Sequence, residues 1–230
     1  MSPSAAECPS VVLTIGHSTR PLEELVGILE AHGVRHLADV RTIPRSRHNP
    51  QFNRDRLVRG IPRAGIGYTH MPVLGGLRHA RPDSPNQGWR NASFRGFADY
   101  MQAPEFEAGL GALIEAAARA RTAIMCAEAV PWRCHRSLIA DALCARGVLV
   151  EHILSATRAE PHVLTAFATV EGTRVTYPPL LGKEPTGRAT RQARRSRLHV
   201  APPSARSPEA RRKKVAGAGT SARSDLTRKS

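Results

Sequence analysis

The alternation of short apolar runs with an amphipathic segment across residues 11–40 constrains the fold more than any other feature. Residues 11–15 (VVLTI) form a continuous and mostly β-branched run that ends at Gly16, a pattern typical of a buried strand. Leucines at helical spacing follow, and they predict a helix capped by Ser18 or Thr19. A second strand is predicted over residues 34–40. A β-α-β unit of this length favours a parallel sheet with a right-handed crossover.

The same alternation continues through the next hundred residues. Apolar runs predict further strands over residues 67–74, 122–127 and 148–154, and helical spacing predicts helices over 94–101, 104–120 and 134–146. Residues 41–63 and 78–91 are predicted to be long connections, with a short helix near 54–58. Residues 163–178 are ambiguous, and they can hold a short helix and one more strand around 173–177. We therefore expect one three-layer α/β domain over residues 11–182, with a mostly parallel sheet of about five strands.

Charge is concentrated at the end of the sequence. Residues 183–230 hold fourteen Lys/Arg and three Asp/Glu, which accounts for +11 of the total net charge of +15. This Arg/Ala/Ser/Pro-rich segment has no aromatic residue, so we expect a disordered basic tail that cannot bury enough apolar area to fold. Residues 1–10 are expected to be a flexible N-terminus.

The location of the protein is predicted from its cysteines and its apolar segments. Four cysteines are too few for a disulfide framework in 230 residues, which favours a reducing compartment. The run at residues 11–15 is too short for a signal sequence, and no segment approaches the ~18 apolar residues of a membrane span. We expect a cytoplasmic protein that does not bind membranes.

Polar side chains stand where the predicted strands end. In an open parallel sheet these ends share one edge, and ligands bind in the crevice there. We therefore expect one pocket, with Glu128, Asp39 and His17 as candidate catalytic residues and with Ser18, Arg41, Gly75, Gly76, Arg136 and His135 as candidate substrate-binding residues.

Two of these groups have alternative interpretations. Asp39 and Arg41 point to the same side of a strand, so they either pair with each other or present Arg41 to a phosphate or carboxylate. Glu128 follows an apolar run, where burial raises a carboxyl pKa unless a cation such as Arg136 lies nearby. Such a group suits general acid–base or nucleophilic chemistry, and a structural Glu–Arg pair is the alternative.

The Cys134-His135-Arg136 segment opens a predicted helix, a position that lowers a thiol pKa. It lacks the glycine-rich loop of a phosphatase and the C-x-x-C pair of a dithiol oxidoreductase. The spacing from Cys126 to Cys134 is not that of a zinc finger, although Cys126, Cys134 and His135 can still meet in space. The main interpretation assigns no metal and leaves the cofactor unidentified, and a metal or thiol site at these three residues is the alternative.

The blocks T-I-G-H-S-T, D-V-R-T-I-P-R-S, L-G-G, C-A-E and C-H-R occur in this order across residues 11–154. Together they resemble the family called domain of unknown function 488. The resemblance implies a compact α/β domain with a polar pocket built by those blocks, and it implies no catalytic assignment. The residue roles given above therefore come from side-chain chemistry alone.

These observations favour an enzyme that acts on a small phosphate-bearing ligand, such as a nucleotide, or on a nucleic acid. Hydrolysis or glycosyl transfer fits better than redox chemistry, because the sequence has no G-x-G-x-x-G fingerprint. The alternative is a non-catalytic nucleic-acid-binding module, because arginines accompany Phe52 within residues 41–63 and accompany Trp89 and Phe94 within residues 78–95. The basic tail would strengthen binding to any polyanion.

Overall fold

A six-stranded sheet organises residues 11–179, the part of the chain that the computed structural model describes. Its strands, in the order in which they lie side by side, are β3 (Gly67–His70), β2 (His36–Asp39), β4 (Thr122–Cys126), β1 (Val11–Gly16), β5 (Leu149–Ser155) and β6 (Arg158–Pro161). The first five strands are parallel, and β6 is antiparallel to β5 at the edge. The predicted mostly parallel α/β sheet is confirmed.

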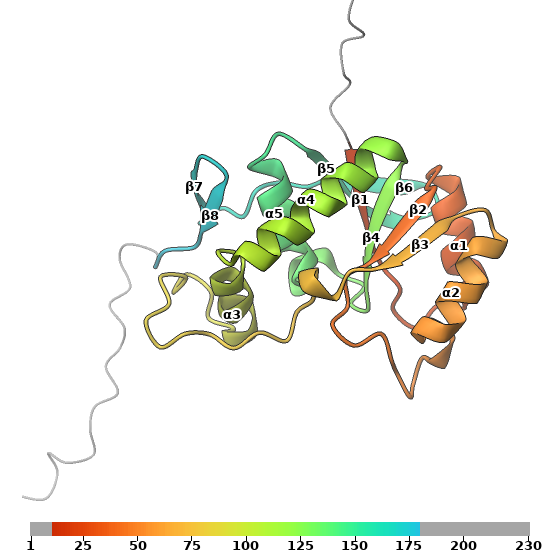
Figure 1. The fold of residues 1–230 in the computed structure, drawn as a ribbon, viewed down its shortest axis with the longest axis horizontal. Helices are drawn as coiled ribbons and strands as arrows, with labels where there is room; N and C mark the ends of the chain where they lie inside the picture. The colour runs from red at the N-terminus through yellow and green to blue at the C-terminus, as the bar shows by residue number, and fades with distance from the viewer. Residues whose placement is uncertain (1–10, 180–230) are drawn as a thin grey trace, which may run out of the picture. The chain divides into compact units, whose positions relative to one another are not determined.

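Helices cover both faces of this sheet, as Figure 1 shows. On one face lie α1 (Leu22–Ala31) and α2 (Arg54–Arg63), and on the other lie α3 (Ala92–Tyr100), α4 (Pro104–Arg119) and α5 (Arg136–Cys144). Alternate residues of β1 serve the two cores, because Leu13 packs with α1 and α2 while Val12 packs with α3, α4 and α5. The result is the expected three-layer architecture.

The start of α1 differs from the prediction. The helix begins at Leu22, and its N-cap is Pro21 with no side-chain hydrogen bond, so neither Ser18 nor Thr19 caps it. Ser18 instead adopts a positive φ of 53°, and its backbone N–H donates to the Ala127 carbonyl at 2.9 Å. The turn after β1 is therefore tied to the end of β4, which brings two separate strand ends together.

Several connections also differ from the prediction. The short helix expected near 54–58 is the ten-residue α2, and the strand expected over 67–74 ends at His70 because the 3₁₀ helix η2 (Pro72–Leu74) follows. Two further 3₁₀ helices, η1 (Pro50–Phe52) and η3 (Pro131–Arg133), lie in the loops. Residues 163–178 contain the antiparallel hairpin β7 (Thr169–Glu171) and β8 (Arg174–Thr176).

The predictions for residues 1–10 and for the basic tail at 183–230 lie outside the described residues. Among residues 11–179, no helix has both the length and the apolar composition needed to cross a membrane.

Candidate active site

A cavity of about 470 Å³ opens at the carboxyl ends of β1 and β4, and we call it the strand-end cavity. Side chains or backbone from several of the predicted blocks line it together: His17, Ser18, Gly76, Cys126, Glu128, Cys134 and His135. Four other residues named from the sequence are not part of this lining, namely Asp39, Arg41, Gly75 and Arg136. The strand ends thus surround the strand-end cavity, and the buried charged residues Asp39, Arg41 and Arg136 are not part of its lining.

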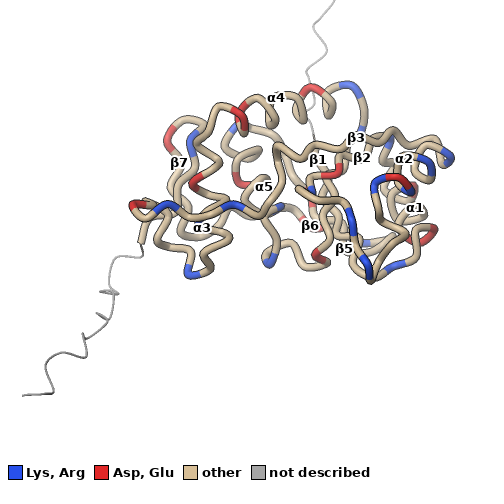
Figure 2. Tube along the Cα trace, turned by 60° about the horizontal axis from the view of Figure 1, so that its bottom comes forward, with Lys and Arg blue, Asp and Glu red and all other residues tan. Residues whose placement is uncertain are grey.

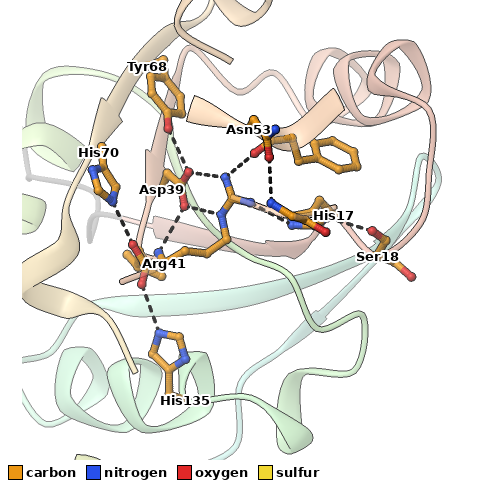
Figure 3. Close-up of polar contacts among 11 residues, drawn as sticks. His17, Ser18, Asp39, Arg41, Asn53, Tyr68, His70 and His135 are labelled. Atoms are coloured by element: carbon orange, nitrogen blue, oxygen red, sulfur yellow. Dashed lines mark hydrogen bonds and ion pairs between the residues drawn. The ribbon is translucent and has the colours of Figure 1, made fainter. Parts of the chain in front are cut away.

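Asp39 and Arg41 form a buried pair, which Figure 3 shows in close-up, and neither residue belongs to the cavity lining. The Arg41 guanidinium donates to both Asp39 carboxylate oxygens, from Nη2 at 2.6 Å and from Nε at 2.8 Å. Nη2 also donates to the Phe52 carbonyl at 2.8 Å, and Tyr68 donates its hydroxyl to Asp39 at 2.8 Å. Of the two interpretations made from the sequence, the pairing of Asp39 with Arg41 is the one found here.

His17 lies between this pair and the cavity. Its Nδ1 donates to the Ser18 carbonyl at 2.8 Å, and its Nε2 accepts from Arg41 Nη1 at 3.1 Å. The ring stacks on Phe52 with 4.1 Å between centroids. Burial lowers the pKa of His17 to about 4, so the ring is neutral at pH 7. His17 therefore holds the wall in place and has no free nitrogen for proton transfer.

The two predicted glycines each make a close contact with a different segment of the chain. A Cβ on Gly76 would lie 3.2 Å from His135 Nδ1, so this glycine lets the loop pack against the imidazole ring. A Cβ on Gly75 would lie 2.7 Å from the Thr42 backbone nitrogen, so Gly75 packs against the segment after β2. Leu77, the next residue, has a φ of 59°, and with Ser18 it is one of two non-glycine residues of the described chain with positive φ. Both line the cavity, and backbone strain of this kind gathers at functional sites.

Cys126, Cys134 and His135 lie side by side in the cavity lining, and we call them the Cys–His cluster. Their ligand atoms all lie within 4.8 Å of one another. His135 Nδ1 is 3.7 Å from Cys134 Sγ and 3.9 Å from Cys126 Sγ. Cys126 comes from the end of β4, whereas Cys134 and His135 come from the turn that opens α5. The alternative site considered from the sequence thus has its three members side by side.

A hydrogen bond on the far side of the ring fixes the orientation of His135. Its Nε2 lies 3.3 Å from the Val40 carbonyl oxygen. Figure 3 marks this contact with a dashed line from the His135 ring. A carbonyl only accepts, so Nε2 carries the proton and Nδ1 presents a lone pair to both sulfurs. The tautomer of His135 is therefore set by the backbone that follows β2.

Arg136 lies beneath the cluster and is fully buried. Its guanidinium donates to neutral oxygens: the Glu128 carbonyl at 2.6 Å, Thr14 Oγ1 at 3.1 Å and the Ala129 carbonyl at 3.3 Å. None of the ion pairs among the described residues includes Arg136, and its Nε has no hydrogen-bond partner there. A buried cation without a counter-charge favours negative charge on nearby groups.

The two thiols respond to this environment in opposite directions. The neighbouring Cys126 thiol, followed by the charge of Arg136, lowers the pKa of Cys134. The proximity of Cys134, together with burial, raises the pKa of Cys126 well above its usual value. Of the two thiols, Cys134 is therefore the one that ionises more readily.

Glu128 differs from what the sequence predicts. Its side chain is exposed rather than enclosed by apolar residues, and within residues 11–179 its carboxylate accepts one weak hydrogen bond, from the Val130 N–H at 3.5 Å. Arg136 binds the backbone carbonyl of Glu128 and not its carboxylate, because β4 has already ended and the side chain turns outward. Glu128 is nevertheless part of the cavity lining.

Sequence reasoning missed several residues that line the cavity. Arg133 and Phe97 belong to it, as does Asn49 from the long connection after β2. Arg133 directly precedes Cys134, so its place near the site could have been predicted. The sequence around Phe97 indicates only an ordinary core position of α3. Asn49 carries no local signal, since only the fold brings its loop to this edge.

Comparison with known proteins places this site within a family. A family model described as "Domain of unknown function DUF488" matches residues 21–143, more than half of the chain. The chain belongs to the DUF488 family. No curated protein and no solved structure matches it significantly.

The DUF488 match extends from the residue before α1 almost to the end of α5. It therefore includes the Asp39–Arg41 pair, both loop glycines and the whole Cys–His cluster. His17 and Ser18 precede the matched residues, although they line the same cavity.

Proposed function

We propose that this DUF488 protein is an enzyme that acts on a small phosphate-bearing substrate in the strand-end cavity, with the Cys–His cluster as its reaction centre. The observation that carries the proposal is that one cavity lies against Cys126, Cys134 and His135 together. Concave sites with a few convergent polar groups are where small ligands bind, and perturbed thiols within them mark reactive positions.

The charges around the cavity support an anionic substrate. Arg133 is exposed and lines the cavity, and Arg136 contributes an unpaired buried charge beneath it. Arg41 is already neutralised by Asp39, so in this proposal the pair positions the wall instead of touching substrate. Arg133 is therefore the group that we assign to the phosphate.

Glu128 supplies the acid–base function in this proposal. Its exposed carboxylate lines the cavity and has no strong partner in the described part of the chain, so in this proposal it exchanges a proton with a bound substrate. Hydrolysis or glycosyl transfer needs such a group, because a leaving group must be protonated.

A thermal-shift screen of nucleotides and sugar phosphates tests this function. A ligand at 100 times its Kd stabilises the fold by about 2.7 kcal/mol. We expect Arg133→Gln to abolish the shift caused by a phosphate ligand, and Glu128→Gln to keep the shift but to stop turnover of that ligand. Cys144→Ser, a change at a cysteine outside the cavity lining, is the matched control. A ligand shift unaffected by Arg133→Gln would contradict the proposal.

A nucleic acid is the second candidate partner, supported by the surface around α2. Six arginines there are exposed, namely Arg45, Arg47, Arg54, Arg56, Arg59 and Arg63, and Figure 2 shows basic positions along this part of the chain. The one acidic residue among them is Asp55, which pairs with Arg59 at 3.4 Å. A surface of this kind binds phosphate backbones through charge.

Salt dependence distinguishes this second function. The logarithm of the association constant for single-stranded or duplex nucleic acid should fall linearly with the logarithm of the salt concentration. The double variant Arg56→Gln, Arg63→Gln should make this slope shallower by the amount expected for about two phosphate contacts. A slope unchanged by these substitutions would exclude the α2 surface as the binding face.

A further inference from the structure

We propose that Cys126, Cys134 and His135 bind a zinc ion that keeps one coordination position open to the strand-end cavity, and that Glu128 takes the proton from water bound there. This inference rests on the proposed function, because it names the reaction centre of the same site. It makes the reaction a hydrolysis.

The spacing of the three ligand atoms supports a tetrahedral ion. Zinc lies about 2.3 Å from a thiolate sulfur and about 2.0–2.1 Å from an imidazole nitrogen, so tetrahedral angles separate sulfur and nitrogen by about 3.6 Å. The observed separations from His135 Nδ1 are 3.7 Å to Cys134 Sγ and 3.9 Å to Cys126 Sγ. The His135 nitrogen thus lies within a few tenths of an ångström of the separation that a tetrahedral ion requires from each sulfur, and the two sulfurs lie within 4.8 Å of each other.

The hydrogen bond from His135 Nε2 to the Val40 carbonyl is a second and independent observation. Histidines that bind metals donate their other ring N–H to a carbonyl or carboxylate, which fixes the ligating nitrogen. Here the proton is held on the side of the ring away from the sulfurs. The loop glycine Gly76 packs on the same ring and confines it further.

The two sulfurs and one imidazole nitrogen of the cluster indicate which ion binds and whether its role is structural or catalytic. Two thiolates and one imidazole suit zinc, whereas magnesium and calcium prefer oxygen ligands. The cluster found among residues 11–179 has three members, so a four-coordinate ion has one position left. Structural zinc sites are closed by four protein ligands, and three ligands with an open position are typical of catalytic zinc.

Glu128 stands two residues after Cys126 and lines the same cavity without ligating. In the zinc deaminases, where a His/Cys/Cys set binds the ion, a glutamate that is not a ligand carries the proton. The step balances without any oxidant or reductant. Water gives one proton to Glu128 while its oxygen bonds to the electrophilic phosphorus or carbon of the substrate. The bond from that atom to the leaving group breaks, and the leaving group keeps the electron pair and takes the proton from Glu128.

Zinc content of the full chain is the first test. The protein is purified without a histidine tag in the presence of a non-thiol reductant, incubated with Zn²⁺ and freed of unbound metal. We expect one zinc per chain, and we expect Cys126→Ser, Cys134→Ser and His135→Ala each to lose it. Cys144→Ser is the matched control and should keep full zinc. Absence of stoichiometric zinc in the unaltered chain, or equal zinc in all variants, overturns the inference.

Cobalt substitution tests the open position. Co²⁺ in place of zinc should give the intense visible bands of a tetrahedral thiolate site, and inorganic phosphate should change them by entering the fourth position. Bands that phosphate leaves unchanged indicate a closed site and overturn the catalytic assignment. Gly76→Ala should weaken metal affinity by about 10–100-fold, because its Cβ displaces the His135 ring.

The outcomes separate this inference from the proposed function. If the chain holds no zinc but Cys134 reacts rapidly with iodoacetamide, the site is a thiolate centre, so the metal inference fails and the enzyme proposal stands. If zinc binds and responds to phosphate but no phosphate ester or nucleotide is turned over, the metal site stands and the proposed function fails.

Discussion

Asp39 shapes the wall of the strand-end cavity without entering it. Its carboxylate is fully buried and accepts hydrogen bonds from the Arg41 side chain, from the Arg41 backbone N–H at 3.1 Å and from Tyr68. Burial, together with the Asp39 charge, raises the pKa of Tyr68, so its hydroxyl stays a donor. Because Arg41 also binds the Phe52 carbonyl and His17, this one carboxylate fixes both sides of the loop behind the cavity.

Removing the charge of Asp39 should lower the stability of the fold far more than removing the charge of an exposed aspartate. Asp39→Asn leaves the Arg41 guanidinium buried without a counter-charge, so we expect the free energy of unfolding to fall by about 3–5 kcal/mol. Asp55→Asn is the matched control, because the Arg59–Asp55 pair is 70% exposed on each side, and it should change stability by less than about 0.5 kcal/mol. Urea unfolding of both variants decides this, and similar small losses would contradict it.

At the scale of elements, hydrophobic periodicity predicted the strands and helices whose core faces follow a regular pattern. It missed the bounds of elements that depend on contacts with residues distant in the sequence. The sequence predicted β1 and α4 almost to the residue, since a continuous apolar run and a helical stripe each match one kind of core face. The length of α2 was missed because Gly60 and Pro62 are unusual inside a helix, and only packing of Leu57 and Ile61 supports it.

The candidate site was predictable to a similar degree. Its residue types could be named because the ends of parallel strands share one edge. The pairing of Arg41 with Asp39, the exposure of Glu128 and the meeting of Cys126 with His135 depend on side-chain directions. Those directions are set by turns such as the positive φ of Ser18, which no local pattern encodes.

Gly16→Ala tests the junction of β1 and β4, and Gly27→Ala in α1 is its control. A Cβ on Gly16 would lie 2.0 Å from the Glu128 carbonyl oxygen, and backbone cannot yield as a flexible side chain does. We expect Gly16→Ala to lower the free energy of unfolding by about 3 kcal/mol or more. Gly27→Ala in the middle of α1 meets nothing within 4 Å, so better helix propensity should raise stability by up to about 1 kcal/mol. The midpoint temperature of thermal unfolding should fall in Gly16→Ala and rise in Gly27→Ala. A change in the same direction in both variants would refute the packing argument.

Across the whole described molecule, a chain of buried hydrogen bonds links the sheet to α5 and to the segment after β8. Thr14 of β1 bonds to His152 Nδ1 of β5 at 2.7 Å, and His152 Nε2 bonds to His162 Nδ1 at 2.9 Å. His162 Nε2 then bonds to Asp141 of α5 at 2.8 Å, and Asp141 also accepts from the Tyr177 hydroxyl at 2.7 Å. A network of this kind is stabilising only while every member keeps the protonation state that its partners require.

Acid should therefore weaken the fold through His152. Burial, followed by the charges of His162 and Arg136, lowers the pKa of His152 from 6.5 to about 4, although Asp141 and Cys134 oppose the shift. Between these two pH values the unfolded chain binds a proton that the folded chain does not, so the free energy of unfolding falls as pH falls through this window. The loss from this group is at most about 3 kcal/mol, at 1.36 kcal/mol for each unit of pKa.

His152→Gln isolates this effect, because an amide can still bond to Thr14 and His162 but does not titrate. Urea unfolding between about pH 7 and pH 4.5 should give a stability that declines more gently in the variant, by up to one proton in the slope. Taking the difference between the two proteins cancels every other group that titrates in this range. An identical decline in both would mean that His152 charges as readily in the folded chain as in the unfolded one, and the buried network would then have to open before the rest of the molecule does.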